Sequence, residues 1–326
     1  MKGIIGLDIG GTKCAVLIAS VEGEIRILER EQFDTPKKGG FPAAYEKLCE
    51  GIERLAARNR QVEPAGIGVS CGGPLDSRRG VILSPPNLPG WDEIYLPRML
   101  RERYGLPAFI MNDANACALT EWKLGAGRGT QDMVFLTMGT GMGAGIIAGG
   151  RLLIGASDMA GEVGHIRLSD DGPIGFGKAG SFEGFCSGGG IARLAQAAAR
   201  EAAAGGAPLD FAPDEERILA ITARSLAEAA KGGSEAARAI YAQVGARLGQ
   251  GIALLCDLLN PECVVIGSIF VRAQELLRPS MERVLEREAL CHSRRVLRVV
   301  PAQTGEALGD LASIMTAVYN LGLNLE

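Results

Sequence analysis

The sequence predicts a duplicated α/β fold with two lobes. Two stretches, IIGLDIGGTKCAVLI and MVFLTMGTGMGAGII, have the same outline of an apolar strand, a glycine-rich turn and a returning apolar strand. Each stretch opens one half of the 326-residue chain, a length that suits two domains or one large divided domain. A repeated strand–turn–strand pattern indicates a duplicated unit, although two unrelated glycine hairpins could also look alike.

The first half predicts four strands besides the returning strand of the hairpin, and two helices. Alternating or continuous apolar runs bounded by glycine, proline or asparagine indicate the strands, and apolar residues at helical spacing indicate the helices. In chain order we expect a hairpin over residues 3–8 and 14–19, a strand over 24–33, a helix over 43–59, a strand over 65–70, a strand over 107–113 and a helix over 114–127.

The second half begins with the same pattern and then becomes mainly helical. The alanine-rich stretches favour helix, and a Pro after Asn marks the end of the longest one. We expect strands over 133–138, 144–150 and 151–155, helices over 188–204, 214–231 and 234–259, a strand over 262–268, a helix over 272–289, a strand over 295–302 and a closing helix over 305–320.

The composition excludes several function classes. The formal net charge of −4 argues against a broad surface for nucleic acid. It does not argue against a small anionic ligand, because helix ends and backbone amides bind phosphate without a basic patch. No signal peptide and no apolar span of twenty residues is found, so we expect neither export nor membrane insertion.

The eight cysteines indicate a reducing compartment. None forms a C-x-x-C pair, and most lie in apolar runs such as ALLCDLL around Cys256. Buried free thiols of this kind are typical of cytoplasmic proteins, so we expect a cytoplasmic location.

The first glycine turn predicts a phosphate-binding site. Adjacent glycines let backbone amides approach phosphate oxygens, a threonine adds a hydroxyl and a lysine adds charge. The aspartate at the strand end suits Mg²⁺, held through water. A strand follows these glycines instead of a helix, which excludes both a Walker loop and a Rossmann fingerprint. An ordinary hairpin turn is the alternative interpretation. The residues are Asp8, Gly10, Gly11, Thr12 and Lys13.

The second glycine turn predicts a matching phosphate contact. It contains Thr140, Gly141 and Gly143 in the run GTGMG. Two equivalent hairpins that face one another across a cleft would hold a triphosphate from both sides. Together they make nucleotide binding a stronger prediction than either turn does alone.

Asn112 and Asp113 end a short apolar strand and begin a helix. Helix capping is one interpretation, because both side chains accept hydrogen bonds from free amides. Beside two phosphate turns we favour catalysis: a carboxylate within reach of a hydroxyl accepts its proton as a phosphoryl group arrives.

The order of five motifs resembles the ROK family of bacterial sugar kinases, in the wider actin-like (ribonuclease H-like) ATPase fold. They are DIGGTK, the turn at 73–76, the run NDANA at 112–116, GTGMGAGI, and EVGH at 162–165. The resemblance covers residues 3 to 320. It implies two actin-like lobes, with a sugar and MgATP in the cleft between them.

The resemblance also implies roles for single residues. Asp113 matches the general base, ATP supplies the phosphoryl group, and Mg²⁺ accompanies ATP. Gly267, in LLNPECVVIGS, precedes the adenosine pocket, although Ser268 replaces the usual second glycine. Positions that match sugar contacts are Gly73, Asn87, Asn112, Asp113, Glu162, His165 and Glu183. Taken alone, Asn87 suits an ordinary turn, Glu183 suits a surface, and Glu162 and His165 share a helix face or one turn.

The chain departs from the family at a zinc-binding loop. Many ROK proteins carry C-x-C-G-x-x-G-C-x-E here, whereas this chain has Ile174, Phe176 and Ser181 at the cysteine positions. Ile and Phe cannot bind zinc, and Ser is a poor substitute for a thiolate. Cys186 and His165 are too few ligands, so we expect no structural zinc and a loop packed by Ile174 and Phe176.

The resemblance further implies a homodimer and a division into two lobes. We expect residues 1–112 and about 305–326 in the N-terminal lobe, and residues 113–304 in the C-terminal lobe. The helix around ALGDLA at 307–312 would cross back to the first lobe.

The sequence predicts an ATP-dependent hexose kinase and leaves its acceptor open. Glucose is favoured, followed by N-acetylmannosamine or another N-acetylhexosamine, then fructose or allose. A sugar-binding protein without catalysis remains an alternative, which the altered zinc loop motivates. A transcriptional regulator is disfavoured because the chain starts at the first strand, without a winged helix-turn-helix. An actin-like ATPase that binds no sugar is disfavoured by the residues at 162–165 and 183.

Overall fold

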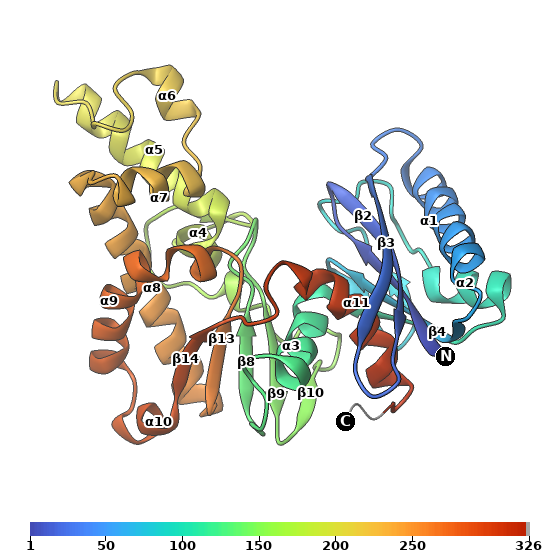
Figure 1. Ribbon diagram of the computed structural model, residues 1–326. Coiled ribbons are helices and arrows are strands. Elements are labelled where there is room, and N and C mark those ends of the chain that lie inside the picture. The colour runs from blue at the N-terminus through green and yellow to red at the C-terminus, as the bar shows by residue number, and fades with distance from the viewer. Residues whose placement is uncertain (324–326) are drawn as a thin grey trace. The chain divides into compact units, whose positions relative to one another are not determined.

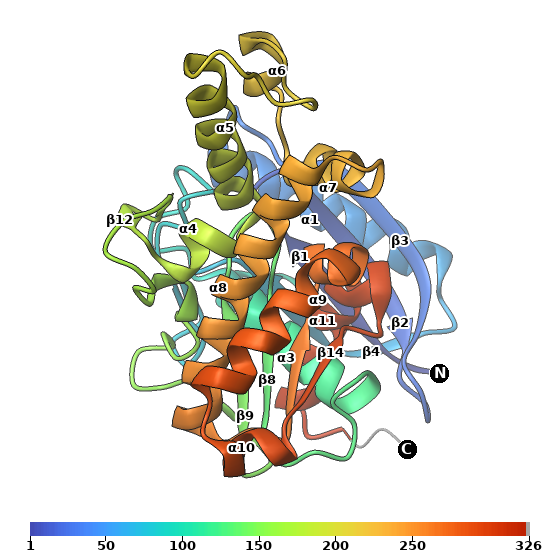
Figure 2. The same ribbon diagram turned by 90° about the vertical axis from the view of Figure 1, so that its left-hand side faces the viewer.

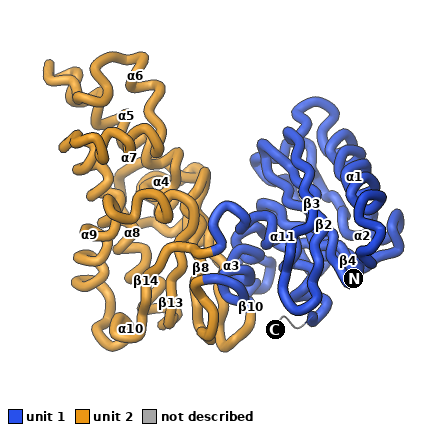
Figure 3. The backbone as a smooth tube through the Cα atoms, viewed as in Figure 1, with its two compact units in different colours: residues 1–125, 152–160, 304–326 blue, residues 126–151, 161–303 orange. Residues whose placement is uncertain are grey.

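A computed structural model describes residues 1–323 of the chain. The chain divides into two compact units. Unit 1 comprises residues 1–125, 152–160 and 304–326, and unit 2 comprises residues 126–151 and 161–303 (Figure 3). The lobe boundaries expected at 112 and 304 stay predictions.

Unit 1 is built on a five-stranded sheet with the order β3-β2-β1-β4-β7. β1 pairs antiparallel with β2 and parallel with β4, and β7 extends the parallel part. Its elements are β1 (Lys2–Ile9), β2 (Lys13–Ser20), β3 (Arg26–Asp34), α1 (Gly40–Arg58), β4 (Glu63–Cys71), β5 (Leu75–Asp76), β6 (Val81–Ile82), α2 (Leu96–Tyr104), β7 (Ala108–Asn112), α3 (Asp113–Leu124), η2 (Gly305–Ala307) and α11 (Leu308–Asn320).

Helices cover the sheet of unit 1 (Figure 1). α11 packs against β1, β4 and α3, while α1 packs against β2. The close fit of α11 depends on glycine, because a β-carbon on Gly68 of β4 would lie 2.0 Å from the Ser313 carbonyl oxygen. The buried Trp91 packs edge-on against Phe41 at 5.0 Å between ring centroids. This core fixes the strand ends that carry the predicted site residues.

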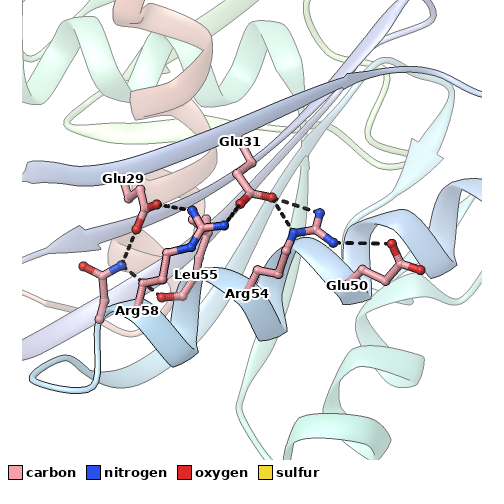
Figure 4. A network of polar contacts seen from close by, with 7 residues as sticks. Glu29, Glu31, Glu50, Arg54, Leu55 and Arg58 are labelled. Atoms are coloured by element: carbon pink, nitrogen blue, oxygen red, sulfur yellow. Dashed lines mark hydrogen bonds and ion pairs between the residues drawn. The ribbon is translucent and has the colours of Figure 1, made fainter.

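The side of α1 that faces β3 is tied to that strand by ion pairs (Figure 4). Arg54 donates to Glu31 at 3.0 Å, and Arg58 donates to both Glu29 and Glu31. Exposed pairs of this kind each contribute at most about 1 kcal/mol. The buried apolar side chains, more than this network, therefore hold the helix on the sheet.

Unit 2 is built on a second five-stranded sheet with the order β10-β9-β8-β13-β14. β8 pairs antiparallel with β9 and parallel with β13, as β1 does with β2 and β4. β10 (Arg151–Leu153) begins at the last residue of the 126–151 stretch of unit 2 and continues into residues that belong to unit 1. The other elements of unit 2 are β8 (Met133–Leu136), β9 (Ala144–Ala148), η1 (Val163–His165), β11 (Ile174–Gly175), β12 (Lys178–Ala179), α4 (Phe182–Cys186), α5 (Gly188–Ala204), α6 (Glu215–Leu219), α7 (Ala223–Lys231), α8 (Glu235–Leu259), β13 (Cys263–Ile266), α9 (Ile269–Glu288), α10 (Cys291–Val296) and β14 (Arg298–Pro301).

The matching strand orders confirm the predicted duplication. In both sheets the glycine hairpin supplies two antiparallel strands, and two later strands add in parallel. In unit 2, α8 and α9 lie side by side along much of their length (Figure 2). Their contact requires Gly249, because a β-carbon there would lie 2.4 Å from the Met281 carbonyl oxygen.

One predicted helix is wrong as a single element. The stretch 214–231 contains two helices, α6 and α7, separated at Thr222. The Thr222 hydroxyl accepts from the Ser225 amide and the Ser225 hydroxyl accepts from the Thr222 amide. This reciprocal capping box starts a new helix despite the favourable alanine content.

Candidate active site

The first glycine turn joins β1 and β2 in unit 1. Its base is closed by the Gly10 amide, which donates to the Lys13 carbonyl at 3.0 Å. The Thr35 hydroxyl donates to the Gly10 carbonyl at 2.7 Å. Gly11, Thr12 and Lys13 are exposed. The turn therefore has a fixed base and an accessible tip that can meet a ligand.

Gly11 also lies against Asn87, a predicted sugar contact. A β-carbon on Gly11 would lie 2.6 Å from the Asn87 β-carbon and 2.7 Å from its carbonyl oxygen. Real β-carbons do not approach other atoms this closely, so only glycine fits here. The structure thus joins a predicted phosphate residue to a predicted sugar residue within unit 1.

Gly73, Asn112 and Asp113 meet at the ends of β4 and β7. Cys71 and Asn112 are register partners at these strand ends. A β-carbon on Gly73 would lie 3.1 Å from the Asn112 Nδ2 atom. Three predicted sugar-site residues therefore come together at one edge of the sheet.

Asn112 and Asp113 also perform the capping function that was the alternative interpretation. The Asn112 Oδ1 atom accepts from the Ala114 amide at 2.9 Å and from the Asn115 amide at 3.4 Å. The Asp113 Oδ1 atom accepts from the Ala114 amide at 2.8 Å. The side chain of Asp113 nevertheless remains accessible to solvent. Capping holds its carboxyl group in one orientation and leaves Oδ2 available for a ligand.

The surrounding protein alters the acidity of two aspartates in unit 1. Desolvation raises the pKa of Asp113, and the hydrogen bond from the Ala114 amide partly offsets this effect. The pKa of Asp8 rises to about 6, first through burial and then through repulsion by Asp310 and Asp113. Arg30 opposes this rise and donates to the Asp310 Oδ2 atom at 2.8 Å.

Asp310 and Arg30 are residues of this site that sequence reasoning missed. Asp310 lies in the first turn of α11, and its neighbour Gly309 faces Asp8: a β-carbon on Gly309 would lie 3.0 Å from the Asp8 Oδ2 atom. Arg30 lies on β3. The match of 307–312 to the family's closing helix was a usable signal for Asp310, whereas Arg30 carries no motif.

The second glycine turn joins β8 and β9 in unit 2. The Thr137 amide donates to the Gly143 carbonyl at 3.0 Å, and the Gly143 amide donates to the Thr137 hydroxyl at 2.9 Å. The Gly188 amide, at the start of α5, donates to the Gly139 carbonyl at 2.7 Å. Thr140 is exposed at the tip. This turn has the same design as the first, with a bonded base and an open tip.

Glu183 contacts the second glycine turn. Its Oε2 atom accepts from the Met142 amide at 3.1 Å, and a β-carbon on Gly141 would lie 3.0 Å from the same atom. Gly164 packs between them, since its β-carbon would lie 2.1 Å from the Met142 carbonyl oxygen. Glu183, which is predicted to bind sugar, thus also holds the predicted phosphate turn in its conformation.

Glu162 precedes a single 3₁₀ turn, η1, and His165 is its last residue; both are exposed. This agrees with the expectation that they line one turn. The backbone carbonyl of His165 accepts from the Lys178 Nζ atom at 2.8 Å. In unit 2 the structure therefore brings together Thr140, Gly141, Gly143, Glu162, His165 and Glu183.

The loop that replaces the zinc motif is not packed as expected. Ile174 is 55% exposed and Phe176 is 75% exposed, so the prediction that they pack the loop is wrong. Polar groups hold it instead: the Arg193 Nη2 atom donates to the Ile174 carbonyl at 2.7 Å. The buried Ser181 caps α4 by accepting from the Gly184 amide at 3.1 Å.

Within residues 1–323, no three His, Cys, Asp or Glu side chains are arranged to hold a metal ion. The absence of structural zinc stays a prediction. No helix of the described chain is long and apolar enough to cross a membrane.

Gly267 and Ser268 lie beside the second turn. The Gly267 amide donates to the Leu136 carbonyl at 3.0 Å. A β-carbon on Gly139 would lie 3.6 Å from the Ser268 Oγ atom, which is an ordinary contact. Ser268 adopts φ +53° and ψ −107°, a conformation that favours glycine.

The model of the ROK family matches residues 4–316. The chain belongs to the ROK family. The expected actin-like ATPase fold is confirmed, since the solved ROK sugar kinases that it resembles share this two-lobed α/β architecture.

Two curated relatives of this ROK protein are sugar kinases. The glucokinase of Halalkalibacterium halodurans is 32% identical over 290 residues, which cover 88% of this chain and 86% of that protein. The N-acetylmannosamine kinase of Shigella boydii is 32% identical over 264 residues, which cover 81% of each.

Solved structures of both enzymes and regulators resemble this ROK protein. A glucokinase from Streptomyces griseus, in complex with glucose and AMPPNP, has a TM-score of 0.74 and 30% identity, over 96% of this chain and 98% of that one. A ROK transcriptional regulator, a homologue of E. coli MLC, has a TM-score of 0.85 and 26% identity, over 98% of this chain and 79% of that one. The fold alone therefore does not separate kinase from regulator.

Proposed function

We propose that this ROK protein transfers the γ-phosphoryl group of ATP to a hexose hydroxyl, with Asp113 as the general base. One observation carries the proposal: Asp113 is oriented by the Ala114 amide and stays accessible, beside Asn112 and Gly73. A fixed, accessible carboxylate next to other polar groups suits removal of a proton from a bound hydroxyl. The glucokinase relatives support the same reaction.

The two glycine turns bind the phosphates in this proposal. Their exposed tips offer backbone amides and the hydroxyl groups of Thr12 and Thr140. Phosphoryl transfer needs positioning and charge stabilisation, not a covalent intermediate on the protein. Gly267, next to the second turn, is proposed to lie at the adenosine.

Asp8 suits Mg²⁺ that arrives with ATP. Carboxylate oxygen is the ligand type that Mg²⁺ prefers, and the ion commonly takes one or two carboxylates and completes its shell with phosphates and water. Bound Mg²⁺ supplies charge neutralisation for the phosphates. A nearby cation would also relieve the repulsion among Asp8, Asp113 and Asp310 that raises the pKa of Asp8.

The proposed sugar contacts are Gly73, Asn87, Asn112, Asp113, Glu162, His165 and Glu183. Glucose is the first acceptor that we propose, because the glucokinase relatives cover most of this chain. N-acetylmannosamine is the second, supported by the relative from Shigella boydii. From the family resemblance we also propose a homodimer that works in the cytoplasm.

The test is sugar-dependent ADP release by purified protein with MgATP, over a panel of hexoses and N-acetylhexosamines. Phosphorus NMR of the product identifies the sugar phosphate. We expect turnover with one acceptor class and little ATP hydrolysis without sugar. Absence of turnover with every sugar, in a protein that binds sugar, would favour the second candidate function, a non-catalytic sugar sensor similar to the ROK regulator.

A further inference from the structure

Phe176 is a large apolar residue that is exposed to solvent and has a positive φ. It lies with Gly177 in the two-residue turn between β11 and β12, and its side chain is 75% exposed. Both turn residues have positive φ, +42° for Phe176 and +75° for Gly177. Turns of this type favour Asn-Gly or Gly-Gly, and a bulky residue with positive φ is strained. Strain kept at an exposed site points to a functional constraint.

The ring of Phe176 contacts the imidazole of His165. The ring centroids lie 6.2 Å apart with an interplanar angle of 75°, an edge-to-face arrangement. Aromatic rings favour this geometry because the positive edge of one ring meets the negative face of the other. Both side chains are exposed, so the contact contributes little to the core of unit 2.

The hairpin is fixed in place relative to His165. The Lys178 Nζ atom, from β12, donates to the His165 carbonyl at 2.8 Å. The Arg193 Nη2 atom donates to the Ile174 carbonyl at 2.7 Å, and the Ser181 hydroxyl donates to the Gly175 carbonyl at 3.4 Å. The base of the hairpin is therefore anchored, and its tip presents Phe176 to the imidazole.

We propose that Phe176 is a positioning residue for the sugar, acting through His165. Its ring restricts the imidazole to the orientation that hydrogen-bonds a sugar hydroxyl. The inference rests on the proposed function, in which His165 contacts the sugar. The β11–β12 loop therefore orients His165 through the contact between the two aromatic rings. Hydrogen bonds to backbone carbonyls hold the loop in place for this contact.

The first test is steady-state kinetics of Phe176→Ala with its matched control Ile174→Ala. Loss of one aromatic pair predicts a rise in the sugar KM of about 3- to 10-fold. The ATP KM and kcat stay within about twofold in that variant, because the phosphate turns and Asp113 are untouched. Phe176→Tyr keeps the ring and restores the sugar KM. Ile174→Ala, on the same hairpin and also exposed, leaves all constants unchanged.

The second test follows the imidazoles by NMR. The chain has two histidines, His165 and the exposed His292 on α10, so two sets of ring signals are expected. His292→Gln assigns them. Phe176→Ala shifts the His165 signals through the lost ring current and leaves those of His292 in place. Addition of the accepted sugar to the wild type shifts the His165 signals.

Phe176→Gly separates positioning from a structural role. Glycine removes the strain of the positive φ, so we expect the Tm to stay the same or rise while the sugar KM rises. A lower Tm with an unchanged sugar KM would assign Phe176 a structural role and overturn the inference. So would a sugar KM of Phe176→Ala equal to that of the wild type. A wild type that phosphorylates no sugar would instead overturn the proposed function, and its NMR titration with sugar would show whether His165 contacts one.

Discussion

The Met142 amide donates to the Glu183 carboxylate at 3.1 Å, so within unit 2 the second glycine turn is bonded to a residue that we propose binds the sugar. Glu183 lies in the first turn of α4, and Met142 is buried in the core of the same unit. The Oε2 atom of Glu183 thus stabilises the conformation of the phosphate turn, and its Oε1 atom can bind another partner. Changes at this residue should therefore alter the binding of both substrates.

Glu183→Ala should raise the KM for ATP as well as that for sugar. A hydrogen bond to a charged group contributes about 1.5–3 kcal/mol, so the KM for ATP should rise by about tenfold or more. Glu183→Gln keeps an acceptor oxygen and should have a smaller effect on ATP. Kinetics with each substrate varied in turn measure both constants. An unchanged KM for ATP in Glu183→Ala would mean that the turn keeps its shape without this bond.

Gly11→Ala should weaken the binding of both sugar and ATP, because its new β-carbon would displace Asn87. Overpacking of this kind costs about 1–3 kcal/mol of stability, and the KM values for sugar and ATP should rise together. Gly139→Ala, in the other turn, is the control for stability, since its β-carbon makes only ordinary contacts. Thermal unfolding should show a lower Tm for Gly11→Ala alone. Equal Tm values would contradict the close packing at Asn87.

Asp8→Asn should stabilise the protein without ligands at neutral pH but not in acid. The pKa of Asp8 is about 6 in the folded chain, above its ordinary value of 3.8. Folding then favours the protonated form, so stability falls as the pH rises from about 4 to about 6. Asparagine cannot ionise, so the variant does not lose stability in this pH range.

Thermal unfolding at pH 4 and pH 7.5 measures the effect. The Tm advantage of Asp8→Asn should be present at pH 7.5 and nearly absent at pH 4. Glu24→Gln, which neutralises an exposed carboxylate, controls for the change in net charge. An advantage of equal size at both pH values would show that ionisation of Asp8 is not the cause.

Ser268→Gly should raise stability by about 1 kcal/mol, because glycine adopts the φ of +53° without strain. The KM for ATP should remain near that of the wild type, since the Gly267 amide keeps its bond to Leu136. Denaturant unfolding checks the stability. A loss of stability would mean that the serine hydroxyl makes a contact that offsets its backbone strain.

The sequence predicted most of the fold because each sheet is built from strongly patterned segments. The apolar runs around the two glycine turns predicted both hairpins, and their repetition predicted the matching strand orders. Short helices were missed. α2 has only nine residues, three of them buried, and α10 has six residues, none of them buried, so neither is long enough for a repeating apolar pattern to stand out.

Contacts between distant segments were beyond the reach of pattern reasoning. The sequence placed Gly11 and Asn87 in separate motifs, and only the folded chain brings them together. The same holds for Arg30 and Asp310, which are 280 residues apart in sequence. The prediction that Phe176 packs the loop was wrong. It assumed that an apolar residue is buried, whereas the turn directs this side chain to solvent.

Asp113→Asn in the ADP-release assay tests the central claim most directly. Asparagine has the same shape and keeps the oxygen that accepts from the Ala114 amide, so the helix start should remain intact. Removal of a general base predicts a fall in kcat of at least ~100-fold, with KM values for ATP and sugar near those of the wild type. A variant that folds normally and turns over sugar at a near-normal rate would contradict the role of Asp113 as the base.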